Sequence, residues 1–175
     1  ALAAELPPTL RLGTSSWTYP GWAGLVWDRE YAVDPLSRHG LAAYARHPLF
    51  RAVSLDRTFY KPLEAVRYAQ YAAQVPDDFR FTVKAPAMFT DAMLRNEDGH
   101  GMRRNPYFLD AAQCNGAFMA PLLQGLGQRL GPVVLQFSPL PPYWLERMPE
   151  LIDRLHAFLS AIPVRFTEAP DAVVA

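Results

Sequence analysis

The chain alternates short apolar runs with stretches of helical pattern, and this alternation constrains its fold more than any other feature. Residues 10–15, 52–59, 79–85 and 132–137 have the apolar, β-branched and aromatic composition of strands, and 164–167 begins a fifth such run. Strands that alternate with helices form parallel sheets with right-handed crossovers. We therefore expect an α/β fold, either a TIM-type (β/α) barrel or a doubly wound open sheet. No G-x-G-x-x-G motif follows the first run, which argues against the dinucleotide-binding open sheet.

Prolines and apolar spacing locate the helices. Asp34 and Pro35 have the pattern of an N-cap and first helical residue, opening a helix to about residue 47, and Pro62 opens a second helix. The polar stretch 93–105 is expected to be a long loop, either functional or without fixed structure. Further helices are expected from Asn105–Pro106 onward, over 118–126, and over 144–158.

Composition narrows the class of protein. Half of the 175 residues are hydrophobic, which is enough for one core, so we expect a leader over 1–9 and a single domain over 10–175. The formal net charge is zero, so overall charge favours neither nucleic acid nor an acidic membrane surface. The single cysteine, Cys114, fits a reducing compartment. No apolar run approaches the roughly 20 residues that span a bilayer, and 1–9 lacks a signal-peptide pattern. We expect a cytoplasmic protein.

Side-chain parity predicts a polar face on the sheet. Successive strand residues point to opposite faces, so Val53 and Leu55 share one face while Ser54 and Asp56 share the other. The apolar face should pack under the helices, and in a barrel the other face looks inward. The same alternation in the later strands gives a polar face that holds Ser54, Asp56, Arg80, Thr82, Lys84 and Gln136.

Three of these polar residues come late in their strands, at the end where TIM barrels carry their active sites. Lys84 would bind a phosphate or carboxylate, or serve as a Schiff-base amine if burial lowered its pKa; otherwise it forms a salt bridge to Asp56. Asp56 would act as a general base or metal ligand, or only orient Lys84. Gln136 would hydrogen-bond substrate or cap the barrel mouth. Arg80 comes early in its strand and is expected to be structural.

Aromatic residues follow the first two strands. Trp17, Tyr19 and Trp22 lie in a Pro-Gly loop, and Tyr60 follows the second strand. They would stack on or hydrogen-bond a ligand, with Trp17, Tyr19 and Tyr60 lining the pocket, or else plug the end of the barrel.

Other motifs are not found in the sequence. The histidines show no metal-ligand spacing with another His, Cys or acid, so no metal site is predicted, and no cofactor is indicated. Cys114 has no paired histidine motif and is expected to be a buried or idle thiol. G-x-S-x-G and phosphate-binding G-x-x-x-x-G-K-[ST] motifs are missing as well.

Four segments in order resemble domain of unknown function family 72, the YecE-like proteins. The segment 13–24 (GTSSWTYPGWAG) resembles its opening signature, and Thr58-Phe59-Tyr60 resembles the motif after its second strand. Segments 79–86 (FRFTVKAP), with the lysine in place, and 131–137 (GPVVLQF), followed by Pro139, resemble its third and fourth strands. The resemblance implies a TIM-type barrel and no established activity.

The chain departs from the family pattern at several positions. Ser54 stands where the family usually has glutamate, Asp56 where it has asparagine, and Thr90-Asp91 where it has threonine-histidine. Glu168 resembles a glutamate of its fifth strand, but Pro170 replaces the arginine that usually follows, which puts a role for Glu168 in doubt. A full barrel takes about 250 residues, so we expect this chain to hold the first four to five β/α units.

Three functions are compatible with these features. The first is an enzyme acting on a small phosphorylated or polyhydroxylated substrate, with Lys84 holding the anion and Asp56 moving the proton. The second is a nucleic-acid phosphodiester enzyme or binder, which the neutral net charge disfavours. It would contact bases with the aromatic residues and phosphates with Lys84, Arg57, Arg95, Arg103 and Arg104. The third is a ligand-binding or interaction protein whose polar cleft is structural. The sequence does not fix the oligomeric state.

Overall fold

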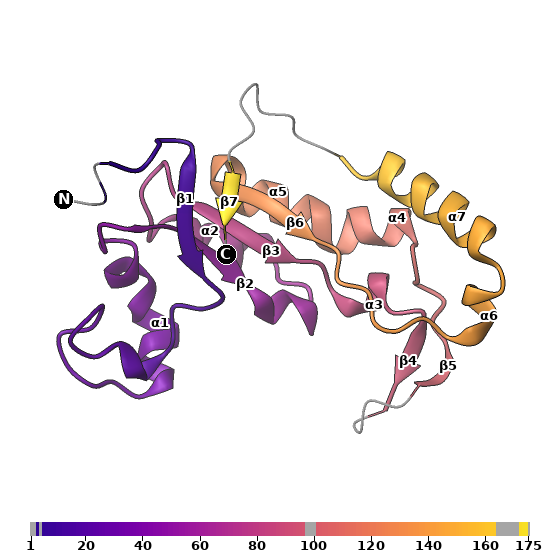
Figure 1. The fold of residues 1–175 in the computed structure, drawn as a ribbon, viewed down its shortest axis with the longest axis horizontal. Helices are drawn as coiled ribbons and strands as arrows, with labels where there is room; N and C mark the ends of the chain where they lie inside the picture. Colours follow the sequence, from indigo (N-terminus) through magenta and orange to yellow (C-terminus); the bar gives the residue numbers. More distant parts are fainter. Residues whose placement is uncertain (1–2, 4, 97–100, 164–171, 175) are drawn as a thin grey trace.

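A computed structural model describes residue 3 and residues 5–96, 101–163 and 172–174 of the chain. Its centre is a parallel sheet of five strands in the order β6-β3-β2-β1-β7 (Figure 1). The α/β fold with a parallel sheet is confirmed. Among the described residues the sheet is open, ending at β6 and β7, and no closure into a barrel is seen. The strands are β1 (Leu10–Thr14), β2 (Phe50–Leu55), β3 (Arg80–Lys84), β6 (Leu130–Val134) and β7 (Ala172–Val174).

Helices cover one face of this sheet. In Figure 1, α2 (Ala65–Ala72) and α5 (Ala120–Leu126) lie behind the strands, while α1 (Val33–Tyr44) lies beside β1 and β2. The strand side chains that parity assigned to the helix side, such as Val53, Phe81 and Val83, are almost completely buried. The core is therefore on the predicted side of the sheet.

The helix that includes α5 begins later than predicted. Asn105 and Pro106 do not open it; Asp110 caps it, because its carboxylate accepts a hydrogen bond from the Gln113 amide at 3.0 Å. The helix then runs through α4 (Ala111–Cys114), a π-helical turn (Asn115–Met119) and α5. The two predicted helical pieces are therefore parts of one continuous helix, followed by a 3-10 turn (Gly127–Arg129).

Other predicted boundaries were also wrong. Ala32, not Asp34, is the N-cap of α1. Asp34 lies in the first turn, where its carboxylate is 3.9 Å from the Arg38 guanidinium. The second helix starts at Ala65, because Glu64 before it has extended backbone. The single helix predicted over 144–158 is two helices, α6 (Pro142–Leu145) and α7 (Met148–Ala161). Pro149 in the first turn of α7 lacks the amide that would continue a helix from α6.

Two strands end earlier than their apolar runs suggested. β2 ends at Leu55, and Asp56 begins a 3-10 turn, η3 (Asp56–Phe59). β6 ends at Val134, so Gln136 lies two residues beyond the strand. The fifth strand predicted over 164–167 lies outside the described residues, as do Glu168, Pro170 and His100. The strand β7 that pairs with β1 was not predicted.

The stretch expected to be a long loop contains regular structure. An antiparallel hairpin occupies it, formed by β4 (Met93–Arg95) and β5 (Gly101–Arg104). A short helix, α3 (Ala87–Thr90), lies between β3 and this hairpin. Another 3-10 turn, η2 (Pro20–Trp22), follows β1. None of the described helices is both long and apolar enough to cross a membrane.

A tyrosine hydroxyl bridges an irregularity between β1 and β2. The pairing shifts between Leu12 and Gly13, and a Cβ atom on Gly13 would lie 2.2 Å from the Ala52 carbonyl oxygen, so only glycine fits there. Just beyond, the Tyr44 hydroxyl accepts a hydrogen bond from the Thr14 amide at 3.0 Å and donates one to the Ala52 carbonyl at 3.1 Å. The Tyr44 side chain, at the end of α1, thus bridges a gap in the hydrogen-bond ladder between β1 and β2.

Candidate functional site

An acid, a base and a hydroxyl meet at the carboxyl ends of β2 and β3. The Lys84 ammonium lies 3.5 Å from the Asp56 Oδ2 atom, and the Ser54 hydroxyl donates to Asp56 Oδ1 at 2.5 Å. The Lys84 side chain is 28% exposed and that of Asp56 39% exposed, so both are accessible to a ligand. We call Ser54, Asp56 and Lys84 the rim triad.

A buried threonine fixes the geometry of the rim triad. The Thr58 hydroxyl, in the turn η3, lies 2.6 Å from both the Leu55 carbonyl and the Lys84 carbonyl. Thr58 is fully buried, so these contacts exclude water. The turn that carries Asp56 is therefore tied to the last residue of β3, which carries Lys84.

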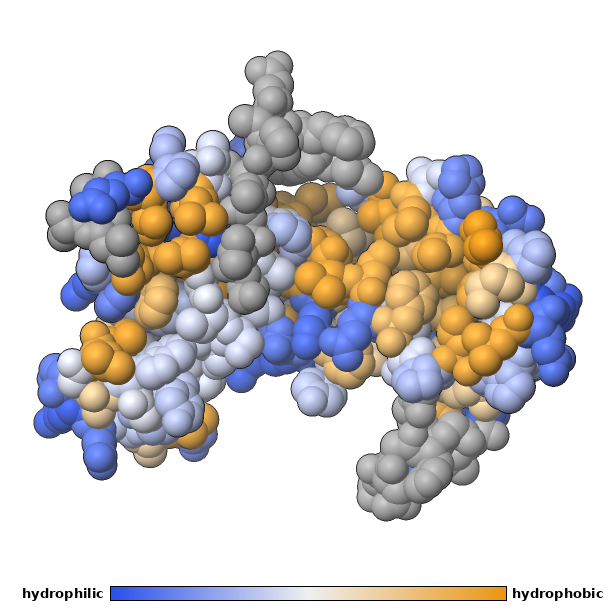
Figure 2. Space-filling view, viewed as in Figure 1, coloured by the Kyte–Doolittle hydropathy of each residue, from blue (hydrophilic) through white to orange (hydrophobic). Residues whose placement is uncertain are grey.

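The register of the strands explains why these side chains share a face. Ser54 pairs with Thr82, and Lys84 pairs with Val134, and paired residues in a parallel sheet point the same way. No described helix crosses this face in Figure 1, and Val134 on it is 38% exposed. Figure 2 shows hydrophobic surface around β6 beside hydrophilic surface at the centre of the same view.

Within the described part of the chain, the other predicted site residues make no hydrogen bond or ion pair with the rim triad. Trp17 is buried in the core, where its indole donates to the Leu36 carbonyl at 3.2 Å and its ring meets Tyr71 edge-on. Tyr19 is 58% exposed and Tyr60 is 86% exposed. Each of these two rings contacts an aromatic neighbour, Trp22 for Tyr19 and Phe59 for Tyr60.

Gln136 and Arg80 have separate surroundings. Gln136 is exposed, and within the described part of the chain it makes no hydrogen bond to Asp56 or Lys84. The Arg80 guanidinium donates to the Asp77 carbonyl at 2.8 Å and to the Phe79 carbonyl at 3.0 Å, at the start of β3. This placement agrees with the structural role predicted for Arg80.

Nucleophile and metal chemistry receive no support from the described residues. Cys114 is fully buried, and burial, together with the nearby Asp110 carboxylate, raises the pKa of its thiol to about 12. It therefore stays protonated at neutral pH. Within 5–96, 101–163 and 172–174, no group of three or more His, Cys, Asp or Glu side chains is placed to hold a metal ion.

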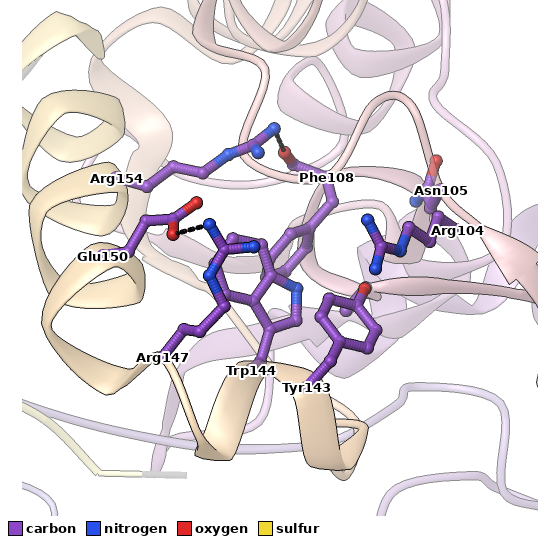
Figure 3. Close-up of a pocket in the computed structure, with 9 residues that line it drawn as sticks. Arg104, Asn105, Phe108, Tyr143, Trp144, Arg147, Glu150 and Arg154 are labelled. Atoms are coloured by element: carbon purple, nitrogen blue, oxygen red, sulfur yellow. Dashed lines mark hydrogen bonds and ion pairs between the residues drawn. The ribbon is translucent and has the colours of Figure 1, made fainter.

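A pocket that the sequence did not predict lies between the hairpin and the last two helices (Figure 3). Its volume is about 130 Å³. Arginine and aromatic side chains dominate the lining, which consists of Ala92, Arg104, Asn105, Phe108, Tyr143, Trp144, Arg147, Glu150 and Arg154. The segments that form it follow the carboxyl ends of β3 and β6. The sequence signal that pointed toward it was the polar stretch 93–105.

Comparison with known proteins places the chain in a family. The chain matches the model of the family "Protein of unknown function DUF72" over residues 11–170. Its fold is similar to a DUF72 family protein from Enterococcus faecalis V583, with a TM-score of 0.52 and 21% identity over 83% of this chain and 46% of that chain. A DUF72 family protein from Thermotoga maritima MSB8 gives a TM-score of 0.49 and 22% identity over 83% and 52% of the two chains.

This chain therefore spans about half the length of these solved proteins. No curated protein matches it. The family match covers most of the sequence and confirms the resemblance carried by its four segments, and the chain belongs to the DUF72 family.

Proposed function

We propose that the protein is an enzyme acting on a small phosphorylated or polyhydroxylated substrate at the rim triad. The observation that carries this proposal is the contact of Asp56 with both Lys84 and Ser54 at the exposed carboxyl end of two adjacent strands. The ammonium has three N–H donors, so two remain for an anionic substrate group while the third faces Asp56.

Asp56 is the group that would move a proton. Its two carboxylate oxygens have different partners: the Ser54 hydroxyl donates to one, and the Lys84 ammonium lies 3.5 Å from the other. A substrate anion that binds Lys84 would compete with this ion pair. The bound substrate would thereby place one of its hydroxyl groups beside the Asp56 carboxylate. With its ion pair to Lys84 broken, this carboxylate could accept the proton of that hydroxyl.

The proposal extends to the fold: the sheet is part of a TIM-type barrel. Each of β2, β3 and β6 pairs in parallel with the strand before it in this series, and β7 pairs with β1 at the opposite edge, where the last strand of a closing barrel would pair. In a closed barrel the face that carries Ser54, Thr82 and Lys84 would look inward. The rim triad would then lie at the mouth, where barrels of this type carry active sites.

Ligand-dependent thermal unfolding tests the proposal. Sugar phosphates, phosphate-free sugars and polyols are screened against the wild type, Lys84→Met and Asp56→Asn. A ligand at 100 times its Kd stabilises the fold by about 2.7 kcal/mol, which is roughly 5–10 °C in Tm for a chain of this size. The matched control is Lys61→Met, which removes the only other lysine, an exposed one.

The expected result is a phosphorylated ligand whose shift is lost in Lys84→Met and kept in Lys61→Met. Asp56→Asn should still bind this ligand, because it keeps the anion-binding ammonium and loses only the proton acceptor. If every stabilising ligand acts equally on Lys84→Met, Lys84 is not in the substrate site and the proposal is wrong.

A further inference from the structure

We propose that the pocket between β5 and the α6–α7 pair is a second ligand site, built to bind a phosphate group. We call it the arginine pocket, after Arg104, Arg147 and Arg154. It shares no lining residue with the rim triad, so the inference does not depend on the function proposed above.

Three chain segments bring the arginines together. Arg104 is the last residue of β5, Arg147 lies between α6 and α7, and Arg154 belongs to α7. In Figure 3, Arg104 extends toward Tyr143 from the hairpin side, while Arg147 and Arg154 extend from the helix side. Guanidinium groups therefore approach the pocket from both of its walls.

Two of these guanidinium groups lie over aromatic rings at cation-π distance. Arg104 lies over the Tyr143 ring at 4.3 Å, and Arg154 lies 5.8 Å from the ring centres of both Phe108 and Trp144. A guanidinium stacked by its face keeps the N–H donors at its edge for other partners. Arg154 uses one of them to donate to the Phe108 carbonyl at 2.6 Å.

The charges of the arginine pocket do not balance. Glu150 is the one carboxylate among its lining residues, and it pairs with Arg147. Three guanidinium groups thus face a single carboxylate, which leaves an excess of two positive charges. Within the described parts of the chain, the contact of Arg104 is its ring stacking on Tyr143, and no carboxylate pairs with it. A dianion would neutralise this excess.

The wall of the pocket is fixed before any ligand arrives. Asn105 is buried, and its amide donates to the Met88 carbonyl at 2.8 Å and to the Asp91 carbonyl at 2.7 Å, while its oxygen accepts from the Tyr107 amide. The Ser138 hydroxyl donates to Asp91 at 3.1 Å. These bonds tie the segments before and after the hairpin to each other and to the segment after β6, so the backbone of this wall needs no reordering on binding.

Size and chemistry together select a phosphate group. A space of about 130 Å³ holds a phosphate and a few waters rather than a drug-sized ligand, which takes roughly 300 Å³ or more. Trp144 is buried, so it supports the arginines and is not a platform for a nucleobase. The planar fork of arginine matches two phosphate oxygens at once. The phosphate would come from a small phosphorylated molecule or from a nucleic-acid backbone.

Calorimetric titration at low salt tests the inference. Inorganic phosphate, a sugar phosphate and a short single-stranded oligonucleotide are titrated into the wild type, Arg104→Gln and Arg147→Gln. Arg154 is left intact because its bond to Phe108 supports the fold. The matched control is Arg67→Gln, because Arg67 also stacks on a tyrosine, at 5.7 Å from the Tyr71 ring, on a helix away from the pocket.

We expect each pocket variant to weaken phosphate binding about tenfold or more, as for loss of a charge-assisted hydrogen bond, and the control to stay within about twofold. Arg104→Lys should fall between the wild type and Arg104→Gln, because it keeps the charge and loses the fork. An oligonucleotide that binds about tenfold tighter than the sugar phosphate, with strong salt dependence, identifies the backbone as the source; equal affinities identify the small molecule.

Lys84→Met separates this site from the rim triad. It can remove only phosphate held at the rim triad, so the binding that Arg104→Gln weakens should persist in Lys84→Met; loss of all phosphate binding in Lys84→Met with no loss in Arg104→Gln would move the phosphate to the rim triad and overturn the inference. Wild-type affinity in both pocket variants, an equal loss in Arg67→Gln, or no binding by the wild type at the highest probe concentration would overturn it as well.

Discussion

Replacing Tyr44 with phenylalanine tests how the gap between β1 and β2 is held. The hydroxyl stands between the Thr14 amide and the Ala52 carbonyl, which would bond directly in a regular parallel ladder. Burial raises the pKa of Tyr44, although hydrogen bonds from Thr14 lower it, so the hydroxyl stays protonated and able to donate. Removal of this one oxygen leaves two backbone groups without their partner and also removes the 2.9 Å contact with the Thr14 hydroxyl.

The magnitude follows from those two groups alone. The phenyl ring of the Tyr44→Phe variant would keep its contacts, which include stacking on Phe50 at 4.7 Å, and the Thr14 hydroxyl would keep its bond to the Ser16 carbonyl at 2.7 Å. Each unsatisfied buried group costs about 1–3 kcal/mol. We therefore expect Tyr44→Phe to lower the free energy of unfolding by about 2–6 kcal/mol.

Denaturant unfolding followed by circular dichroism measures this loss. The control is Tyr31→Phe, because the Tyr31 hydroxyl bonds Asp28 and Arg29 at the surface and its removal should change stability by no more than about 0.5 kcal/mol. The denaturant slope should be the same in both variants. A loss below about 0.5 kcal/mol for Tyr44→Phe would refute the reasoning, because it would show that β1 and β2 close the gap without the hydroxyl.

Three further predictions concern other buried contacts. A Cβ at Gly125 would lie 2.4 Å from the Ala65 carbonyl oxygen, so Gly125→Ala should separate α5 from α2 and lower stability by about 1–3 kcal/mol, despite its better helix propensity; an unchanged Tm would contradict this. The raised thiol pKa of Cys114 predicts that the free energy of unfolding is unaffected by this thiol below about pH 9 and falls as the pH rises toward 12. Cys114→Ala should make this fall less steep in denaturant titrations at several pH values; the same dependence on pH in the variant and the wild type would contradict the prediction. Thr58→Val keeps the shape and removes the hydroxyl that bridges Leu55 and Lys84, so denaturant unfolding should show a loss of about 1–3 kcal/mol, and a neutral effect would show that the bridge is dispensable.

Local pattern predicted the sheet well because its strands are continuous apolar runs. The runs around Val53, Phe81 and Val133 became β2, β3 and β6, and the period of two placed Ser54 and Lys84 on one face. Parity holds only while the backbone stays extended, so the positions beyond strand ends were less well predicted. The end of β2 at Leu55 was not predicted, because the turn η3 that follows it is held by a tertiary contact, from the Thr58 hydroxyl to the Lys84 carbonyl in β3.

The parts that were not predicted depend on contacts between distant segments. Trp17 looked like a ligand-facing aromatic because it follows a strand, but α1 and α2 supply its partners, Leu36 and Tyr71, and bury it. The arginine pocket joins Arg104 to residues of α6 and α7 much further along the chain, and no spacing rule links them. Asn105 resembled a helix start, yet its side chain bonds the segment that precedes the hairpin.

The rim triad also explains how an acid can change position without leaving the site. In the pattern that this chain resembles, a glutamate stands at position 54 and an asparagine at 56, whereas here Ser54 and Asp56 occupy them. A residue at 54 points directly from β2 to the face of the sheet that carries Lys84, where Ser54 itself is buried. Asp56 lies beyond the strand, but the turn η3 folds its carboxylate back over Ser54 and against Lys84. Because Thr58 ties that turn to β3, the negative charge stays beside the lysine, and the small Ser54 side chain leaves room for it. With Ser54 and Asp56 in these positions, the site holds one carboxylate beside Lys84, whereas acids at both positions would give two and acids at neither would give none.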